Sequence, residues 1–270
     1  MAREAALGGS AAKGRGAASD LSRLAERLHV STIVVFVLVL LVWRALSSAF
    51  GSYVMPPPGA VVAGLRRVLV SGELWKHAGA TFYRIVVGFG LALVAAITMG
   101  LLASAWRQAR IAVHDVIAVL NSTSVFVWIV VSLIWFGLTD MAPMFTTLMI
   151  TLPVLASNVV EGVENVDPRH LEMARVYRLG EWERFRSIVI PSTIPYLVAG
   201  MKVGFGLALK VSVVAEIFGV TSGVGYIMNY SREILATDMV FVWAAVMILI
   251  MMLTDKLVFE ALSRRVQRWR

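Results

Sequence analysis

The sequence contains no cysteine, which excludes disulfides, thiolate metal sites and thiol chemistry. Its four histidines, His29, His77, His114 and His170, lack the spacing of metal ligands, so no metal site is predicted and we expect them in loops or at interfaces. No G-x-x-x-x-G-K-S/T phosphate loop occurs, so the chain cannot hold ATP by that means. The polar segments carry no Ser/His/Asp constellation, and no catalytic residue is predicted.

Apolar side chains, by contrast, make up 59% of the chain, and the mean hydropathy is +0.78. Few soluble domains are so apolar. Runs of about 20 apolar residues recur along the whole length, and each can cross a hydrocarbon core of about 30 Å. The sequence therefore predicts an all-α, multi-pass membrane protein. The net charge of +8 could favour a nucleic-acid partner, but its distribution fits membrane topology, so no nucleic acid is expected.

Six membrane spans are predicted. They are Val30–Leu46, Thr81–Ala105, Ile111–Gly137, Ala142–Val163, Tyr196–Gly219 and Val240–Glu260. The first run also resembles a signal peptide, with Ser47 and Ala49 near a cleavage site, but its length favours a retained span. The chain then divides into a tail (1–29), the first span (30–50), a loop with an amphipathic helix (51–80), a core with five spans (81–262) that includes a polar segment (164–195), and a basic tail (263–270).

The distribution of Lys and Arg gives these spans an orientation. Most of them fall in the N-terminal tail, the turn near Arg107, the polar segment and the C-terminus, whereas the other loops hold Arg66, Arg67, Lys76 and Arg232. Because positively charged loops stay in the cytoplasm, both termini and the polar segment are predicted to be cytoplasmic. The amphipathic helix, with apolar residues from Val61 to Leu69 at helical spacing, is then expected on the outer membrane surface.

The longest polar segment between two spans, 166–191, has the pattern of two short helices. Asp167 and Pro168 form an N-cap followed by a proline at the first helical position. The first helix is expected over Leu171–Leu179, and it would end at Gly180 in a left-handed cap. The second is expected over Trp182–Ile190, ending at Pro191. Such an elbow suits docking of a soluble partner, although an ordinary cytoplasmic helix-turn-helix linker has the same pattern.

Several residues within the spans attract attention. Lys210 lies near the middle of the fifth span, where a lysine costs about 2.5–3.5 kcal/mol. It is therefore expected in a buried pair or a structural hydrogen bond, or else lining a pathway for an anion. Glu216 lies near the outer end, and Lys202 can reach the cytoplasmic surface. Asn121 opens a polar stretch, 121–124, in the third span that could line the same pathway or bond back to helix carbonyls.

Small residues recur every four positions in two spans, and such ridges let helices approach closely in lipid. They are Gly88, Ala92, Ala96 and Gly100 in the second span and Gly200, Gly204, Ala208 and Ser212 in the fifth. We expect packing from them, or sliding of helices during gating. The heptapeptide VGFGLAL occurs in both spans, at 87–93 and 203–209, which fits either convergent packing chemistry or an inverted repeat.

The polar segment resembles a known motif. Glu172, Met173 and Ala174, then Gly180, Ile188, Ile190 and Pro191, resemble the E-A-A-x-x-x-G-x9-I-x-L-P loop of ABC-importer permeases, with Met173 and Ile190 as mild departures. Residues 56–90 and several later positions resemble the branch that carries sulfonates, taurine, nitrate and bicarbonate. The third span lacks the prolines usual in that branch, so a straighter third helix is expected.

This resemblance implies a type I ABC-importer fold with six transmembrane helices, in a bacterial inner membrane. It implies an ATPase-coupling site at Glu172, Met173, Ala174, Gly180 and Pro191, and a translocation pathway that includes Lys210, Glu216, Asn121 and Ser212. The implied partners are two cytoplasmic ATPase subunits, an extracytoplasmic binding protein, a second copy of the chain and membrane lipid. No cofactor is expected on this chain, since ATP and Mg²⁺ would be bound by the ATPase, and the chain itself would not be an enzyme.

An ion-coupled secondary transporter is the alternative function. Such a transporter needs carboxylates within the membrane to bind the coupling ion. Glu216, near the outer end of the fifth predicted span, is the candidate for that role, and the sequence favours the importer permease, with a small, anionic solute delivered by a binding protein.

Overall fold

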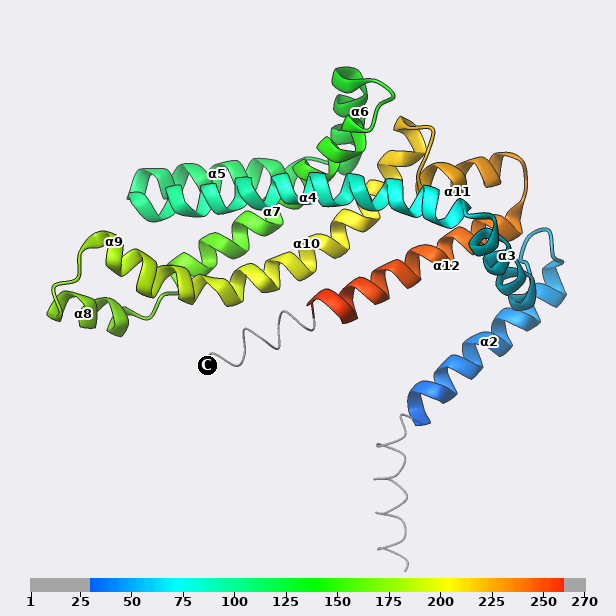
Figure 1. The fold of residues 1–270 in the computed structure, drawn as a ribbon, viewed down its shortest axis with the longest axis horizontal. Helices are drawn as coiled ribbons and strands as arrows, with labels where there is room; N and C mark the ends of the chain where they lie inside the picture. The colour runs from blue at the N-terminus through cyan, green and yellow to red at the C-terminus, as the bar shows by residue number, and fades with distance from the viewer. Residues whose placement is uncertain (1–29, 260–270) are drawn as a thin grey trace, which may run out of the picture. The chain divides into compact units, whose positions relative to one another are not determined.

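The computed structural model describes residues 30–259, and these are helical with no strand among them. The predicted all-α class is confirmed (Figure 1). The described residues fall into two compact units, one that ends at Val62 and one that begins at Ala63.

The first unit contains helix α2, Val30–Phe50, and the start of α3, Pro58–Ser71. The indole Nε1 of Trp43 donates a hydrogen bond to the carbonyl of Pro56 at 3.0 Å, which ties the turn back onto α2. The proline run ends one helix and begins the next, because proline has no N–H but fits the first helical position. The helix predicted around Val61–Leu69 is therefore present as α3, with Arg66 and Arg67 exposed.

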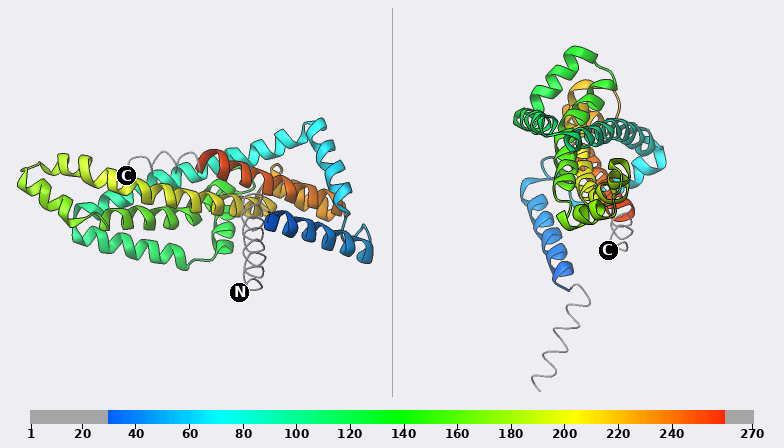
Figure 2. Two further views of the ribbon diagram at one scale, coloured as in Figure 1. Left: turned by 90° about the horizontal axis from the view of Figure 1, so that it is seen from below. Right: turned by 90° about the vertical axis from the view of Figure 1, so that its left-hand side faces the viewer.

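The second unit holds the remaining helices. They are α4 Glu73–Ala105, α5 Arg107–Ser122, α6 Val125–Phe136, α7 Met141–Glu164, α8 Pro168–Val176, α9 Glu181–Arg184, the π-helical η1 Phe185–Val189, α10 Ile190–Gly219, α11 Val224–Glu233, α12 Thr237–Thr254 and the π-helical η2 Asp255–Phe259. Figures 1 and 2 show α4, α5, α7 and α10 lying side by side, with α8 and α9 at one end and α11 at the other. We call these the elbow end and the α11 end.

Helix α7 lies between α4 and α10, and small residues allow the close contact. A Cβ added to Gly88 of α4 would lie 2.5 Å from the carbonyl oxygen of Met144, and one added to Gly200 of α10 would lie 2.7 Å from Asn158 Cβ. Both neighbours belong to α7. The prediction that these ridges pack the spans together is therefore confirmed within the chain, as expected where lipid gives no hydrophobic drive for association.

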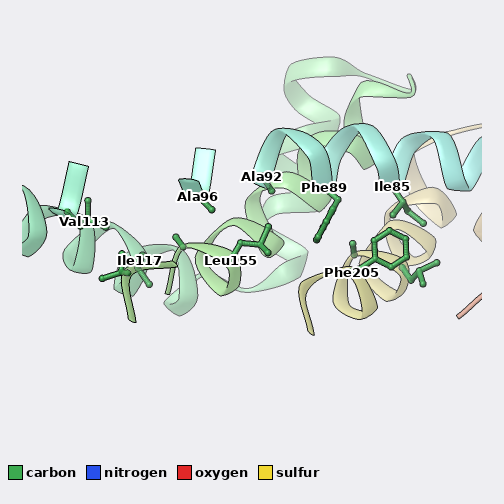
Figure 3. Packing of buried hydrophobic residues seen from close by; sticks show 13 residues of the cluster. Ile85, Phe89, Ala92, Ala96, Val113, Ile117, Leu155 and Phe205 are labelled. Carbon is green, nitrogen blue, oxygen red and sulfur yellow. The ribbon is translucent and has the colours of Figure 1, made fainter. Parts of the chain in front are cut away.

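The two copies of the VGFGLAL heptapeptide meet in the core of this unit. The rings of Phe89 and Phe205 lie edge to face, with their centroids 5.4 Å apart and an interplanar angle of 83°. Ile85, Ala92 and Leu155 are fully buried beside them (Figure 3). The heptapeptide thus serves as a packing element between α4 and α10, and aromatic pairs of this geometry add about 0.5–1.5 kcal/mol to the burial of their surfaces.

The predicted number of six spans is not matched exactly. Among the described residues, four helical segments are long and apolar enough to cross a membrane: Glu73–Ala105, Met141–Glu164, Glu181–Gly219 and Thr237–Leu257. The bent pair α5 and α6 makes a fifth if it counts as one span. The apolar stretch Val34–Phe50 of α2 is shorter than these four segments.

The expected straight third span is wrong. Helices α5 and α6 meet at an angle of 92° (Figure 1), because Thr123 and Ser124 adopt extended backbone angles between them. The hydroxyls of Ser122 and Thr123 donate to the carbonyl of Val119 at 2.8 and 3.0 Å. Serine and threonine compete in this way with helical hydrogen bonding, so the polar stretch breaks the helix without a proline.

Aromatic packing and one hydroxyl pair hold α6 in its turned position. Trp135 and Phe136 of α6 surround Phe145 of α7, with ring centroids 5.4 and 5.3 Å away. Thr146 donates to the hydroxyl oxygen of Ser132 at 3.0 Å, and both side chains are buried. The bend is therefore supported by tertiary contacts as well as by local sequence.

Candidate functional site

The elbow begins as the sequence predicts. Asp167 caps α8, and its carboxylate accepts a hydrogen bond from the N–H of Arg169 at 2.9 Å. Pro168 takes the first helical position, where its missing N–H leaves no helical bond unmade.

The end of α8 differs from the prediction that Gly180 forms a left-handed cap. The helix ends at Val176, and Arg178 takes the left-handed conformation, with φ +53°. The N–H of Leu179 donates to Ala174 O and that of Arg178 donates to Arg175 O, both at 3.0 Å. This is the Schellman pattern. Gly180 instead has φ −60° and caps the start of α9, where its N–H donates to the Glu183 carboxylate at 3.3 Å.

The prediction that a helix ends at Pro191 is also wrong. The chain stays helical from Glu181 to Gly219 through a π-helical turn, Phe185–Val189. Pro191 then occupies the first turn of α10. A proline within a helix cannot donate to the fourth residue before it and its ring clashes with that carbonyl, and π-turns are a common way to absorb such a defect. The second helix of the elbow, α9, therefore continues into α10 as one helical segment.

The elbow has a small core of its own and an apolar surface left over. Val166, Ala174 and Ile188 are buried together, and Leu171 and Val189 pack against them. Three large apolar side chains nevertheless face outward: Val176 is 80% exposed, Tyr177 73% and Trp182 70%. A prebuilt elbow that displays apolar and charged side chains has the properties of a docking surface.

The five predicted ATPase-coupling residues all lie in this elbow. Glu172, Met173, Gly180 and Pro191 are exposed, whereas Ala174 is 1% exposed and belongs to the elbow core. Ala174 thus shapes the elbow from inside, and the other four are available to a partner. Their contact with an ATPase stays a prediction.

The predicted pathway residues are not gathered in one place. Lys210 is exposed on α10 and Asn121 is exposed beside the bend after α5. Ser212 and Glu216 are fully buried. Lys210 forms no ion pair with any described residue. The predicted buried ion pair is therefore absent from the described part of this chain. Whether these residues line a pathway stays a prediction.

Two further side chains have partners that the sequence did not indicate. Lys202 is exposed, as expected, and its Nζ lies 3.0 Å from Asp255 Oδ1 in η2. His77 is not in a loop. It lies in α4, where it is buried between the rings of Tyr226 and Trp243 at centroid distances of 6.5 and 5.6 Å.

A buried polar cluster lies at the α11 end, centred on Arg84 of α4. Its Nε and Nη2 donate to Asp140 Oδ1 at 3.0 and 2.7 Å, and its Nη1 donates to Glu216 Oε1 at 2.8 Å. Nη1 and Nη2 also donate to the carbonyl and hydroxyl oxygens of Ser222 at 2.7 and 2.6 Å. These bonds use all five donors of a guanidinium. Arg84 is 1% exposed, so water cannot satisfy a donor of the guanidinium that lacks a protein partner.

Glu216 receives a matching set of bonds. Besides Arg84, its Oε2 accepts from Thr81 Oγ1 and from the N–H of Gly225, both at 2.9 Å. Thr81 and Glu216 are each at most 1% exposed. The carboxylate is therefore compensated by one guanidinium and two neutral donors, which is what a buried charge requires.

The same side chains secure the start of α11. The N–H groups of Gly223, Val224 and Gly225 donate to His77 Nδ1, Thr81 Oγ1 and Glu216 Oε2 at 3.2, 2.8 and 2.9 Å. The first N–H groups of a helix have no partner within the helix, and a carboxylate there is favoured by the helix dipole. We name the set His77, Thr81, Arg84, Asp140, Glu216 and Ser222 the Arg84 cluster.

The sequence indicated Glu216 as a site residue but did not indicate its partners. Arg84 is a charge close to a long apolar run, and that alone is a signal for a buried pair. Nothing local indicates Asp140 or Ser222, which are 56 and 138 positions away along the chain. The carboxylate that an ion-coupled transporter would need is fully engaged in these bonds, which weighs against that alternative.

The chain matches the family model described as "Binding-protein-dependent transport system inner membrane component" over residues 88–269. An aliphatic sulfonates transport permease protein, SsuC, of Escherichia coli is 29% identical over 86% of this chain and 88% of its own length. The taurine transport system permease protein TauC of the same organism is 23% identical over 90% and 89%. The riboflavin transport system permease protein RibX of Chloroflexus aurantiacus is 29% identical over 87% and 88%.

Solved structures share the fold. An amino acid ABC transporter chain has a TM-score of 0.63 at 17% identity, over 74% of this chain and 97% of that one. A chain of the MetNI methionine ABC transporter has a TM-score of 0.60 at 18% identity, over 74% and 95%. The importer-permease fold and function predicted from the polar segment are thereby confirmed. The chain belongs to the family of binding-protein-dependent transport system inner membrane components, and it is a permease subunit of an ABC importer.

Proposed function

We propose that two copies of this chain form the pathway of an importer of the bacterial inner membrane, with two ATPase subunits at the elbow end and a solute-binding protein at the α11 end. ATP and Mg²⁺ would be bound by the ATPase subunits. The observation that carries the proposal is the elbow. It is folded around its own core, it displays Val176, Tyr177 and Trp182, and its second helix, α9, continues into α10.

The charges of the two ends support this orientation. Arg107, Arg110, Arg169, Arg175, Arg178, Arg184 and Arg186 lie at or beside the elbow end, whereas Lys76 and Arg232 lie in α4 and α11 near the other. An excess of arginine marks the cytoplasmic side of a membrane protein, which is where ATPase subunits have access to ATP.

Substitutions in the elbow test this role. Glu172 is exposed and forms no ion pair with a described residue. A Cβ added to Gly180 meets no atom within 4 Å, and aspartate is a favoured N-cap residue. Glu172→Ala and Gly180→Asp should therefore leave folding and membrane insertion intact but abolish the stimulation of ATP hydrolysis by loaded binding protein. The matched control is Asp115→Ala, an exposed carboxylate of α5 that lies in neither the elbow nor α11. Normal coupling in both elbow variants would contradict the proposal.

A small anion is the solute that Lys210 favours. This lysine is exposed on α10 between the buried Leu209 and Val211, inside a membrane-spanning segment. An unpaired cation there costs about 2.5–3.5 kcal/mol, and an anion in the pathway would offset part of that. Two relatives are named for aliphatic sulfonates and for taurine, which carry an anionic sulfonate group, whereas RibX is named for riboflavin.

Replacing Lys210 tests the anion. Lys210→Met should lower the uptake of the solute that the binding protein carries, and Lys210→Arg should retain more of it because the charge remains. Lys202→Met removes a lysine of the same helix that is paired with Asp255, so it serves as the control. Wild-type uptake by Lys210→Met would remove this argument for an anion. Uptake that survives a protonophore but not ATP depletion would separate the importer from an ion-coupled transporter.

A further inference from the structure

We propose that the Arg84 cluster is a positioning device that fixes α11 to the ends of α4, α7 and α10, so that these elements move as one body during transport. Through that body, a binding protein docked at α11 would act along α10 on the elbow. The proposal rests on the function proposed above, and it adds the residues that connect the two ends of the subunit.

The first support is the saturation of the cluster. Arg84 uses all five of its donors, and the three first N–H groups of α11 are all bonded to side chains of α4 or α10. Arg84, Thr81 and Glu216 are at most 1% exposed. Water cannot replace a bond that opens among these three side chains, so opening there is strongly unfavourable. The cluster should therefore stay closed while other parts of the subunit move.

The second support is the surroundings of α11. Its first turn is held by the cluster, whereas Arg232, Glu233, Ile234 and Leu235 at its other end are exposed. Gly225 approaches the Val213 carbonyl of α10 so closely that a Cβ would overlap it. A partner can bind the exposed end of α11. Because the first turn of α11 is held against α10, this turn cannot shift independently of α10 when the partner binds.

The third support is the continuity of α10 with the elbow. The helical segment Glu181–Gly219 has 39 residues and stays helical through the π-turn Phe185–Val189 and through Pro195. At a rise of 1.5 Å per residue it is about 55–60 Å long, which exceeds the thickness of a bilayer. Glu216 lies near one end of it and the elbow at the other, so a tilt imposed at the cluster reaches the elbow directly.

The decisive variant is Thr81→Val, which keeps the shape and every charge but removes the hydroxyl that links Val224 N–H to Glu216. In the complete transporter in lipid nanodiscs, with binding protein purified natively together with its solute, the stimulation of ATP hydrolysis should fall about tenfold. Basal hydrolysis should stay close to wild type. The matched control is Thr98→Val in the same helix, because the Thr98 hydroxyl bonds only to Val94 and Ala95 of its own helix.

A merely structural role would give a different result. If Thr81→Val lowered basal and stimulated hydrolysis in the same proportion, or left stimulation at the wild-type level, the proposal would be overturned. The outcome is separable from the function proposed above. Loss of stimulation in Glu172→Ala together with normal stimulation in Thr81→Val would leave the importer function standing and reject only the role of the cluster.

A distance measurement tests the single body directly. Because the chain has no cysteine, spin labels can be placed at Lys76→Cys on α4 and Arg232→Cys on α11, both exposed positions. Only one copy per transporter carries them, so the measured distance lies within one subunit. Double electron–electron resonance should give the same distance distribution in the nucleotide-free and the ATP-bound transporter, and Thr81→Val should broaden it. A shift of that distance between the two states in the otherwise unaltered chain would refute a rigid body.

Discussion

At Gly223 the backbone has φ +109°, and an added Cβ would lie 2.5 Å from Glu216 Oε2 and 2.6 Å from Arg84 Nη1. Gly223→Ala should therefore lower the melting temperature of the purified subunit, since strained backbone alone costs about 1–3 kcal/mol and the clash adds to it. Gly79→Ala in α4 is the control, because a Cβ there meets no atom within 4 Å. Equal melting temperatures for the two variants would contradict the geometry of the cluster.

Substitutions of Arg84 and of Asp140 should differ in the stability they cost, although the two side chains form an ion pair. Arg84→Leu leaves the buried Glu216 carboxylate without its counter-charge, and loss of one partner of a buried pair costs about 3–5 kcal/mol. Asp140→Asn should cost much less, because the Asp140 side chain is 56% exposed to compensating solvent. Thermal unfolding of both variants checks the order. The double variant Arg84→Leu/Glu216→Leu should recover part of the loss, and no recovery would argue against a direct pair.

The origin of the bend between α5 and α6 can be tested by substituting a proline at the break. Ser124 has φ −64° and the preceding Thr123 is extended, with ψ 128°. Both conformations are those that a proline requires of itself and of its predecessor. Ser124→Pro should therefore keep the fold. It should raise the free energy of unfolding by up to about 1 kcal/mol, because proline lowers the conformational entropy of the unfolded chain.

The control for that substitution lies one helix earlier. Ile117→Pro places a proline in the interior of α5, where the loss of a hydrogen bond and the ring clash cost about 3 kcal/mol or more. Melting temperature and uptake of both variants provide the measurement. If Ser124→Pro destabilised the subunit as much as Ile117→Pro, the break would not have the geometry described here.

At the scale of the whole molecule, the orientation in the membrane can be measured with single cysteines in this cysteine-free chain. A membrane-impermeant maleimide should label Arg232→Cys in α11 in intact cells. It should label Arg169→Cys in α8 only after the membrane is permeabilised. Both positions are exposed, so accessibility to water is matched. Labelling of Arg169→Cys from outside would reverse the orientation and with it the site of the ATPase.

Much of the elbow could be predicted because its signals are local. The cap at Asp167, the proline at 168 and the short polar helix follow from propensities that act within one turn. The predicted ends were less accurate. Arg178 rather than Gly180 took the left-handed position, and Pro191 continued a helix through a π-turn. Both positions flank the elbow core of Val166, Ala174 and Ile188, whose packing is not visible in the local pattern.

The sequence by itself determined the class of this protein, because apolar runs, arginine distribution and the elbow pattern each act over short stretches of chain and do not depend on the fold. The tertiary structure alone decided the Arg84 cluster, and it set the 92° bend together with the local polar stretch 121–124. A buried charge must find its partners wherever the packing of helices brings them, and for Arg84 these partners are Asp140, Glu216 and Ser222, far along the chain. Packing on α7 likewise holds α6 in its turned position, and packing has no signature in a single helix.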